Sequence, residues 1–207
     1  VYYYAWGLGD GDPLSRRRQA AGWLSALLFI VIGFVFTNAM SLVDHVEAWP
    51  ELWQRHSVAG AALGTAMNLA DPTLWPRWLL MFGLAILTTA AWMVVDAAWW
   101  AGSESDDYRA WTRCFAPKLA ALGAVWFAAA GSWYVFGTWS NDLRAAMFEG
   151  PLVVLTFLTA AAPALPVLMM WTIGRTSPGK TTAVAVGLAQ LGVLGINAIS
   201  RQVVQNI

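Results

Sequence analysis

The sequence predicts an all-α, polytopic transmembrane helix bundle, and three observations lead to this fold class. Of the 207 residues, 58% are hydrophobic and only 12% are charged, and the mean hydropathy is +0.54. Soluble domains carry about 25% charged residues, so a chain this poor in charge cannot cover a water-facing surface. Apolar stretches long enough to cross a bilayer recur along the chain, and tryptophan flanks many of them.

The clearest stretch is LWPRWLLMFGLAILTTAAWMVVDAAWW at 74–100, which begins and ends with tryptophans. Further spans are expected at about 19–40, 115–139, 151–173 and 181–200, within one integral membrane domain over 1–207. If the tyrosine-rich residues 1–6 are the end of a further helix, the chain has a sixth span. We also expect the full-length chain to continue beyond both ends, because Val1 is not a start methionine and no terminal signal is present.

The first span, 19–40, directly follows Arg16–Arg18. Its roughly 22 residues, at about 1.5 Å each, are long enough to cross the hydrocarbon layer. Arginine beside a span favours the cytoplasmic side, so we expect Arg16–Arg18 inside. We expect the membrane to be a bacterial inner membrane. The inner side then holds Arg16, Arg17, Arg18, Arg109, Arg113, Lys118, Arg175 and Lys180, against Arg55, Arg77, Arg144 and Arg201 outside.

The outer segment 41–73 is the longest polar part of the chain. Within it, residues 50–63 interleave tryptophan and leucine with charges, which predicts an amphipathic helix lying at the membrane interface. Pro50 suits the first turn of such a helix.

Small residues and prolines indicate how the later spans pack. Ala120, Ala124 and Ala128 lie four residues apart, as do Ala183 and Gly187, and this spacing lets helices approach closely. Two prolines in the fourth span, Pro163 and Pro166, each remove a backbone donor and predict a kink.

His45 and His56 are the only histidines, and both fall on the outer side. One helix would separate two residues 11 apart by roughly 16 Å, so a shared haem iron would require the chain to fold back. Alternatively, one histidine pairs with a methionine or a partner subunit. The plainest alternative is that both bind water, lipid headgroups or nearby acids.

A polar row on the last span comprises Gln190, Asn197, Arg201 and Gln205, on one helix face. In lipid this face must turn toward other helices, a cofactor or a partner chain. Arg201, at the outer end, could hold a haem propionate, a quinone carbonyl or a lipid headgroup.

Asp96 is the acid inside the span at 74–100. Acids within membranes often serve proton relays or ion sites. Because Asp96 lies only about 6 Å from the helix end, a structural role at the cytoplasmic interface, paired with Lys118 or Arg113, is the competing interpretation.

Several classes of function are excluded by what the sequence lacks. It contains no phosphate-binding loop, HExxH motif or nucleophile elbow, which argues against an autonomous hydrolase or kinase. The lone Cys114 allows no CxxC metal site. A net charge of zero gives no indication of a nucleic-acid partner.

Two runs, NAMSL at 38–42 and NLADPTLWPRWLLM at 68–81, resemble cytochrome bd oxidase subunit I-like membrane cytochromes. The resemblance covers about 45 residues and implies quinol-linked electron transfer. Leu80 stands where the family pattern has a haem-ligating histidine, so the resemblance carries no ligand over to this chain.

Together these patterns favour a membrane subunit of an electron-transfer complex, at most a non-autonomous part of an oxidoreductase. It would handle quinone or haem b, or anchor a multihaem cytochrome partner. His45, His56 and Arg201 would line an outer site, and Asp96 would serve proton traffic. One alternative is a structural, lipid-binding subunit that contacts other membrane subunits. A small transporter built on Asp96 and the kinked span is the third.

Overall fold

The computed structural model describes residues 16–99, 106–173 and 179–207, and these are helical apart from one short hairpin and the connecting segments. Five helical segments within these ranges are long and apolar enough to cross a membrane, as predicted. The chain is therefore an integral, polytopic membrane protein. Residues 1–6, which were expected to be the possible end of a sixth span, lie outside the described residues. Two compact units make up the chain, residues 1–74 and 75–207.

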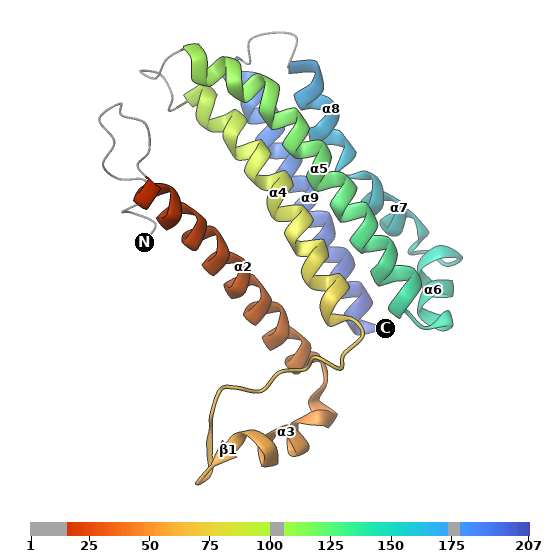
Figure 1. The fold of residues 1–207 in the computed structure, drawn as a ribbon. Helices are drawn as coiled ribbons and strands as arrows, with labels where there is room; N and C mark the ends of the chain where they lie inside the picture. Colours follow the sequence, from red (N-terminus) through yellow and green to blue (C-terminus); the bar gives the residue numbers. More distant parts are fainter. Residues whose placement is uncertain (1–15, 100–105, 174–178) are drawn as a thin grey trace. The chain divides into compact units, whose positions relative to one another are not determined.

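The 1–74 unit begins with α2 (Arg16–Asp44), which is longer at both ends than the predicted 19–40 (Figure 1). Its buried residues are all polar, and two of them satisfy their hydroxyls within the helix. Ser25 donates to the carbonyl of Ala21 and Thr37 to that of Gly33, each at 2.9 Å. Such bonds let hydroxyls sit in lipid, where no water is available.

After α2 come η1 (Val46–Ala48), α3 (Trp49–His56) and the strands β1 (Ser57–Val58) and β2 (Ala61–Ala62). Pro50 occupies the first turn of α3, as predicted. The helix ends at His56, however, and the second half of the expected 50–63 helix is an antiparallel hairpin.

The physical reason for the hairpin lies in its two turn residues. Ala59 has φ 52° and Gly60 has φ 78°, which terminates helical geometry and gives the tight turn that joins two short strands.

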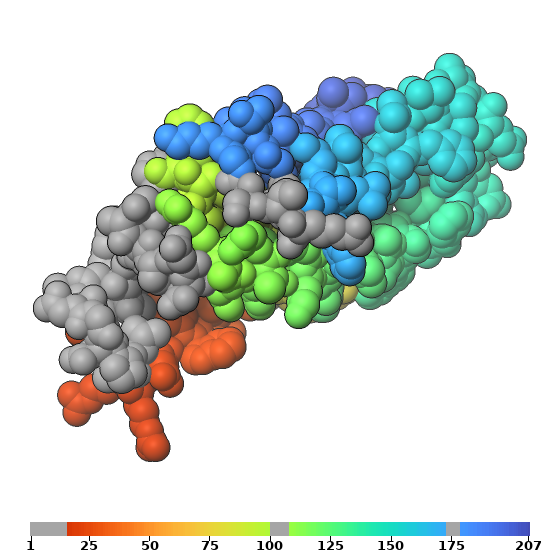
Figure 2. Space-filling model, turned by 90° about the horizontal axis from the view of Figure 1, so that it is seen from above, coloured from red at the N-terminus to blue at the C-terminus, as the bar shows by residue number. Residues whose placement is uncertain are grey.

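The 75–207 unit is a helix bundle of α4 (Leu74–Trp99), α5 (Asp106–Thr138), α8 (Ala164–Ile173) and α9 (Lys180–Asn206) around one apolar core (Figure 1). α8 packs against both α5 and α9, and viewed from above it lies between them (Figure 2). α5 begins at Asp106 rather than near 115, so part of the connection between the spans predicted at 74–100 and 115–139 is helical. The core residues are Leu84, Leu87, Ala90, Ala91, Val94, Ala116, Ala120, Phe127, Met170, Ala183, Val186 and Val193.

α4 and α5 meet backbone to backbone at Gly83 and Gly123. A methyl group on Gly83 would lie 2.7 Å from the backbone nitrogen of Phe127. A methyl group on Gly123 would lie 2.8 Å from that of Leu87. Ala120, the first of the three alanines spaced four apart, lies in the core. The close approach of α4 and α5 nevertheless depends on Gly83 and Gly123.

The other two of these alanines are less central, because Ala124 is half-buried and Ala128 is exposed. A strict four-residue step drifts around a helix that has 3.6 residues per turn. On α9, by contrast, Ala183 is fully buried and Gly187 faces Val95 of α4, as its small size predicted.

The fourth crossing is divided at Pro163 into α7 (Val153–Ala161) and α8, which is the predicted kink. Pro166 has no N–H to give the carbonyl of Ala162, and the backbone nitrogen of Leu165 donates to it instead, at 3.1 Å. The connection between the spans predicted at 115–139 and 151–173 contains a short helix, α6 (Asn141–Phe148). The Ser140 hydroxyl caps its first turn.

Candidate functional site

A group of polar side chains, most of them buried, lies at the end of α2. Asn38, Ser41 and His45 follow one another at steps of three and four residues, which places them on one helix face. The segment leading back to α4 brings Asn68 and Asp71 against that face. We call these five residues the Asp71 cluster, and all of them belong to the 1–74 unit.

Hydrogen bonds run through the cluster without interruption. The Asn38 side chain accepts from the backbone nitrogen of Asn68 at 2.8 Å and donates to the carbonyl of Ala66 at 3.1 Å. The Asn68 amide donates to the Ser41 hydroxyl at 2.8 Å, and that hydroxyl donates to the Asp71 carboxylate. A fully bonded buried network of this kind fixes the returning segment on α2.

Asp71 is the charge at the centre of the network, and its side chain is only 2% exposed. Burial raises the pKa of its carboxyl group. The Ser41 hydroxyl, the backbone N–H of Thr73 at 2.8 Å and nearby His45 outweigh that effect, and the pKa of Asp71 lies below its ordinary value. The cluster therefore holds a buried negative charge at neutral pH.

His45 lies at the edge of the cluster, with 38% of its side chain exposed. Its Nδ1 is 2.9 Å from the carbonyl oxygen of Ser41 and 3.7 Å from the Asp71 carboxylate. A carbonyl can only accept, so Nδ1 carries the proton in this bond. Nε2 is then left as the acceptor or ligand atom of the ring.

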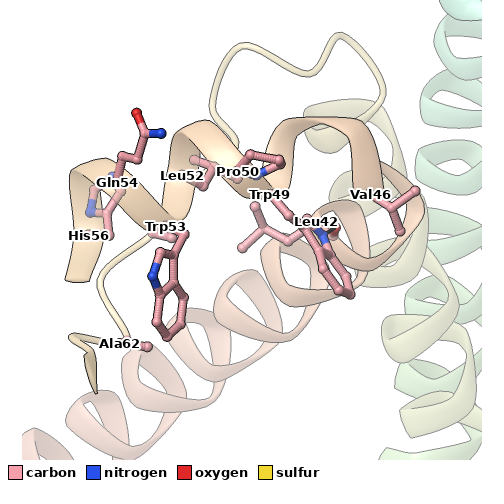
Figure 3. A pocket seen from close by; sticks show the side chains of 11 residues that line it. Leu42, Val46, Trp49, Pro50, Leu52, Trp53, Gln54, His56 and Ala62 are labelled. Atoms are coloured by element: carbon pink, nitrogen blue, oxygen red, sulfur yellow. Dashed lines mark hydrogen bonds between the residues drawn. The ribbon is translucent and has the colours of Figure 1, made fainter. Parts of the chain in front are cut away.

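His56, the last residue of α3, belongs to a different part of the same unit. Its Nδ1 lies 3.3 Å from the hydroxyl of Thr65, and the structure gives it no hydrogen-bond partner in common with His45 among the described residues. Its side chain lines a shallow groove, the α3 groove, whose walls include Leu42, Trp49, Leu52, Trp53, His56 and Ala62 (Figure 3).

The polar row on α9 begins inside the bundle. Gln190 is 3% exposed, and its amide donates to the Thr88 hydroxyl of α4 at 2.9 Å. Asn197 and Arg201 are half-buried, and Gln205 is exposed. Arg201 belongs to the 75–207 unit, so a site shared with His45 and His56 stays a prediction.

Asp96 has a partner that the sequence analysis did not single out. The Tyr108 hydroxyl at the start of α5 donates to its carboxylate at 2.7 Å. Tyr108 in turn stacks on Trp111, which stacks on Phe115. Asp96 thus joins the C-terminal end of α4 to the start of α5, which supports the structural interpretation of this acid.

The chemistry available to these groups is limited. Although serine, histidine and aspartate meet in the Asp71 cluster, the Ser41 hydroxyl is fully buried and bonds the carboxylate directly, so His45 cannot activate it as a nucleophile. No group of three or more potential metal ligands occurs among the described residues. The cluster can instead orient an imidazole beside a buried carboxylate.

Sequence reasoning identified His45 but not the residues that hold it. The contacts of Asn38 with Asn68 and of Ser41 with Asp71 each join residues 30 apart in the sequence. No local periodicity predicts such contacts. One signal was available: Asp71-Pro72-Thr73 directly before a helix is typical of a capping turn, in which the aspartate accepts from the backbone two residues on.

Comparison with protein-family models, curated proteins and solved structures finds no match to this chain. Its fold and composition define the class, a polytopic membrane protein with five candidate spans.

Proposed function

We propose that this protein is a membrane-embedded subunit of an electron-transfer complex and that His45 binds a quinone headgroup or haem b at the end of α2. The observation that carries the proposal is the anchored Nδ1 of His45, 2.9 Å from the Ser41 carbonyl. Histidines that bind metals or substrates commonly donate one ring N–H to a carbonyl or carboxylate, which fixes the other nitrogen for its ligand.

A quinone requires less of this chain than haem b does. Haem b needs an axial ligand on each side of the iron, and His56 is hydrogen-bonded at the far end of α3. The second ligand would therefore come from a methionine or from a partner subunit. A quinol headgroup donates through its hydroxyl and needs one well-placed acceptor, which Nε2 of His45 supplies.

The residues of the Asp71 cluster also suit proton transfer. A bound quinol supplies two electrons and two protons, and the electrons need an acceptor outside this chain, for which we propose a haem-bearing partner such as a multihaem cytochrome. His45 would take one of the two protons at Nε2, and water at the membrane surface would take the other. The Asp71 carboxylate, 3.7 Å from Nδ1, would stabilise the resulting imidazolium.

The resemblance to cytochrome bd oxidase subunit I-like proteins supports the same proposal. The two runs that carry it, 38–42 and 68–81, contribute Asn38, Ser41, Asn68 and Asp71 to the cluster. With Arg16–Arg18 on the cytoplasmic side of a bacterial inner membrane, the cluster would face the outer side.

The test is a reduced-minus-oxidised visible spectrum, a pyridine haemochrome assay and quinone extraction on the complex purified from its native membrane. We expect stoichiometric haem b or quinone, lost in His45→Ala and retained in the matched variant His56→Ala. A purified complex that contains this chain with neither group, or one whose content is unchanged by His45→Ala, would refute the proposal.

A structural, lipid-binding subunit is the second candidate, and the surface of α2 favours it. Large apolar side chains of this helix are widely exposed, among them Trp23, Phe29 and Phe36 at 78%, 62% and 65%. In a membrane such a helix contacts lipid or other membrane subunits. Co-purification of partners without any chromophore or quinone would select this candidate.

A further inference from the structure

The α3 groove is an apolar hollow of about 710 Å³ at the end of a membrane-spanning helix. Its walls come from the last turn of α2, from one face of α3 and from the hairpin (Figure 3). On α3 the lining residues Trp49, Leu52, Trp53 and His56 share one helix face, and Pro50 and Gln54 beside that face also line the groove. The volume falls within the range of small-molecule sites, roughly 300–1,000 Å³.

The walls of the groove are held in place by hydrogen bonds that need no ligand. The indole N–H of Trp49 donates to the carbonyl of Leu42 at 2.7 Å, which fixes the start of α3 on α2. At the other end, the backbone nitrogen of Leu63 donates to the carbonyl of His56 at 2.9 Å. The groove is therefore preformed, which lowers the entropy cost of filling it.

No aspartate, glutamate, lysine or arginine is among the residues that line the groove. The ion pair of α3, Glu51 with Arg55, is exposed and takes no part in the lining. Two indole rings, by contrast, remain about half exposed, Trp49 at 51% and Trp53 at 52%. Gln54 and His56 are the polar side chains of an otherwise apolar lining, which favours an occupant that is apolar where it lies in the groove.

The position of the groove along α2 identifies that occupant. Leu42 and Val46, which line it, bracket the end of α2 at Asp44, so the groove opens where the hydrocarbon meets the headgroups. An amphipathic helix with tryptophans on its apolar face lies at this depth. We propose that the α3 groove binds one acyl chain of a membrane phospholipid, with the headgroup outside the groove.

The strand β2 offers a matched pair of variants to test this proposal. Ala62 lines the groove and Ala61 does not, because successive side chains of a strand point to opposite faces. Ala62→Trp should fill the groove, and Ala61→Trp adds the same bulk on the other face. The purified full chain in detergent is titrated with dioleoyl phosphatidylethanolamine, and bound lipid is counted by native mass spectrometry.

We expect the tightest phospholipid adduct to weaken at least tenfold in Ala62→Trp and to stay unchanged in Ala61→Trp. Excluding only two methylenes from the groove is enough for about a tenfold change. Equal adducts in the two variants would overturn the proposal, since lipid would then bind elsewhere. A prenyl quinone recovered in place of phospholipid, or a change of oligomeric state in Ala62→Trp alone, would also overturn it.

A second substitution covers the case in which Ala62→Trp does not fold. Leu52→Asp places a charge in the wall without adding bulk, and circular dichroism checks that its helix content matches the wild type. It should weaken the same adduct, because an acyl chain cannot offset the burial of a charge. Retention of the adduct in folded Leu52→Asp would count against the acyl-chain site.

Discussion

Asp71 accepts hydrogen bonds from two directions, from Ser41 on α2 and from the backbone of Thr73 before α4. Asp71→Ala leaves both buried donors without their acceptor, which costs roughly 1–3 kcal/mol for each unsatisfied group. We expect faster amide exchange over residues 57–73 in this variant. Glu51→Ala is the matched control, because it removes an exposed carboxylate and should change exchange very little. Equal exchange in the two variants would contradict a structural role for Asp71.

The lowered pKa of Asp71 gives the 1–74 unit a defined pH dependence. The folded state favours the ionised carboxylate, so this stabilisation is fully present above the ordinary pKa of 3.8 and is lost as pH falls through the lower folded value. We expect pepsin to leave residues 57–73 intact near pH 4 and to cleave them increasingly at lower pH. Asp71→Ala should be cleaved at all these pH values, and an identical pH profile for the two proteins would argue against this linkage.

At the same scale, the sequence indicated His45 as a candidate because histidine is rare in this chain. It did not indicate that Ser41 and Asp71 would hold the imidazole, since their contact spans 30 residues and depends on how the outer segment folds back. The pairing of Asp96 with Tyr108 was missed for a related reason. Tyr108 lies between the spans predicted at 74–100 and 115–139, whereas in the structure it belongs to α5.

Among the elements, α4 and α5 depend on glycine at their crossing. Gly83→Ala places a methyl group 2.7 Å from the Phe127 backbone, which only a shift of one helix can relieve. Overpacking of this kind costs typically about 1–3 kcal/mol. Thermal unfolding in detergent should show the loss. Gly192→Ala on α9 is the control, because nothing lies within 4 Å of its added methyl, and the prediction fails if both variants melt alike.

The bond between Gln190 and Thr88 joins α9 to α4 within the bundle. Side-chain hydrogen bonds between membrane helices contribute about 0.6 kcal/mol on average and up to about 1.7. Thr88→Val and Gln190→Leu should each destabilise the bundle by an amount of this order, and a double-mutant cycle should show that the two effects are coupled. Thr89→Val removes a neighbouring hydroxyl that bonds only its own helix and should add no coupling. Strict additivity of Thr88→Val and Gln190→Leu would exclude the bond.

The spans were predictable as elements because length and apolar composition are local properties of the chain. The division of α7 from α8 was predictable because proline removes a backbone donor wherever it lies. The hairpin after α3 was not, since Ala59 is an ordinary helix former and only its positive φ beside Gly60 turns the chain. The crossing at Gly83 was missed because glycine has no periodic signal unless its partner helix is known.

For the whole molecule, the five candidate spans predict that the two ends of the described chain lie on opposite sides of the membrane. In a Cys114→Ser background, we expect Ser57→Cys to react with an impermeant maleimide in intact cells. Gly179→Cys should react only after the membrane is opened, because it precedes α9 on the side of Arg16–Arg18. The opposite pattern would invert the orientation, and labelling of both in intact cells would exclude an odd number of crossings between them.

α7 and α8 contain nine and ten residues, about 14 and 15 Å of helix, and each covers only half of the hydrocarbon layer. During synthesis, neither can therefore pass from the translocon into lipid as a crossing of its own. The ribosome must deliver the residues on both sides of Pro163 before this part of the chain can leave the aqueous channel. A chain that has emerged from the ribosome only as far as Ala162 would contain three complete crossings and one that is still too short to span the membrane.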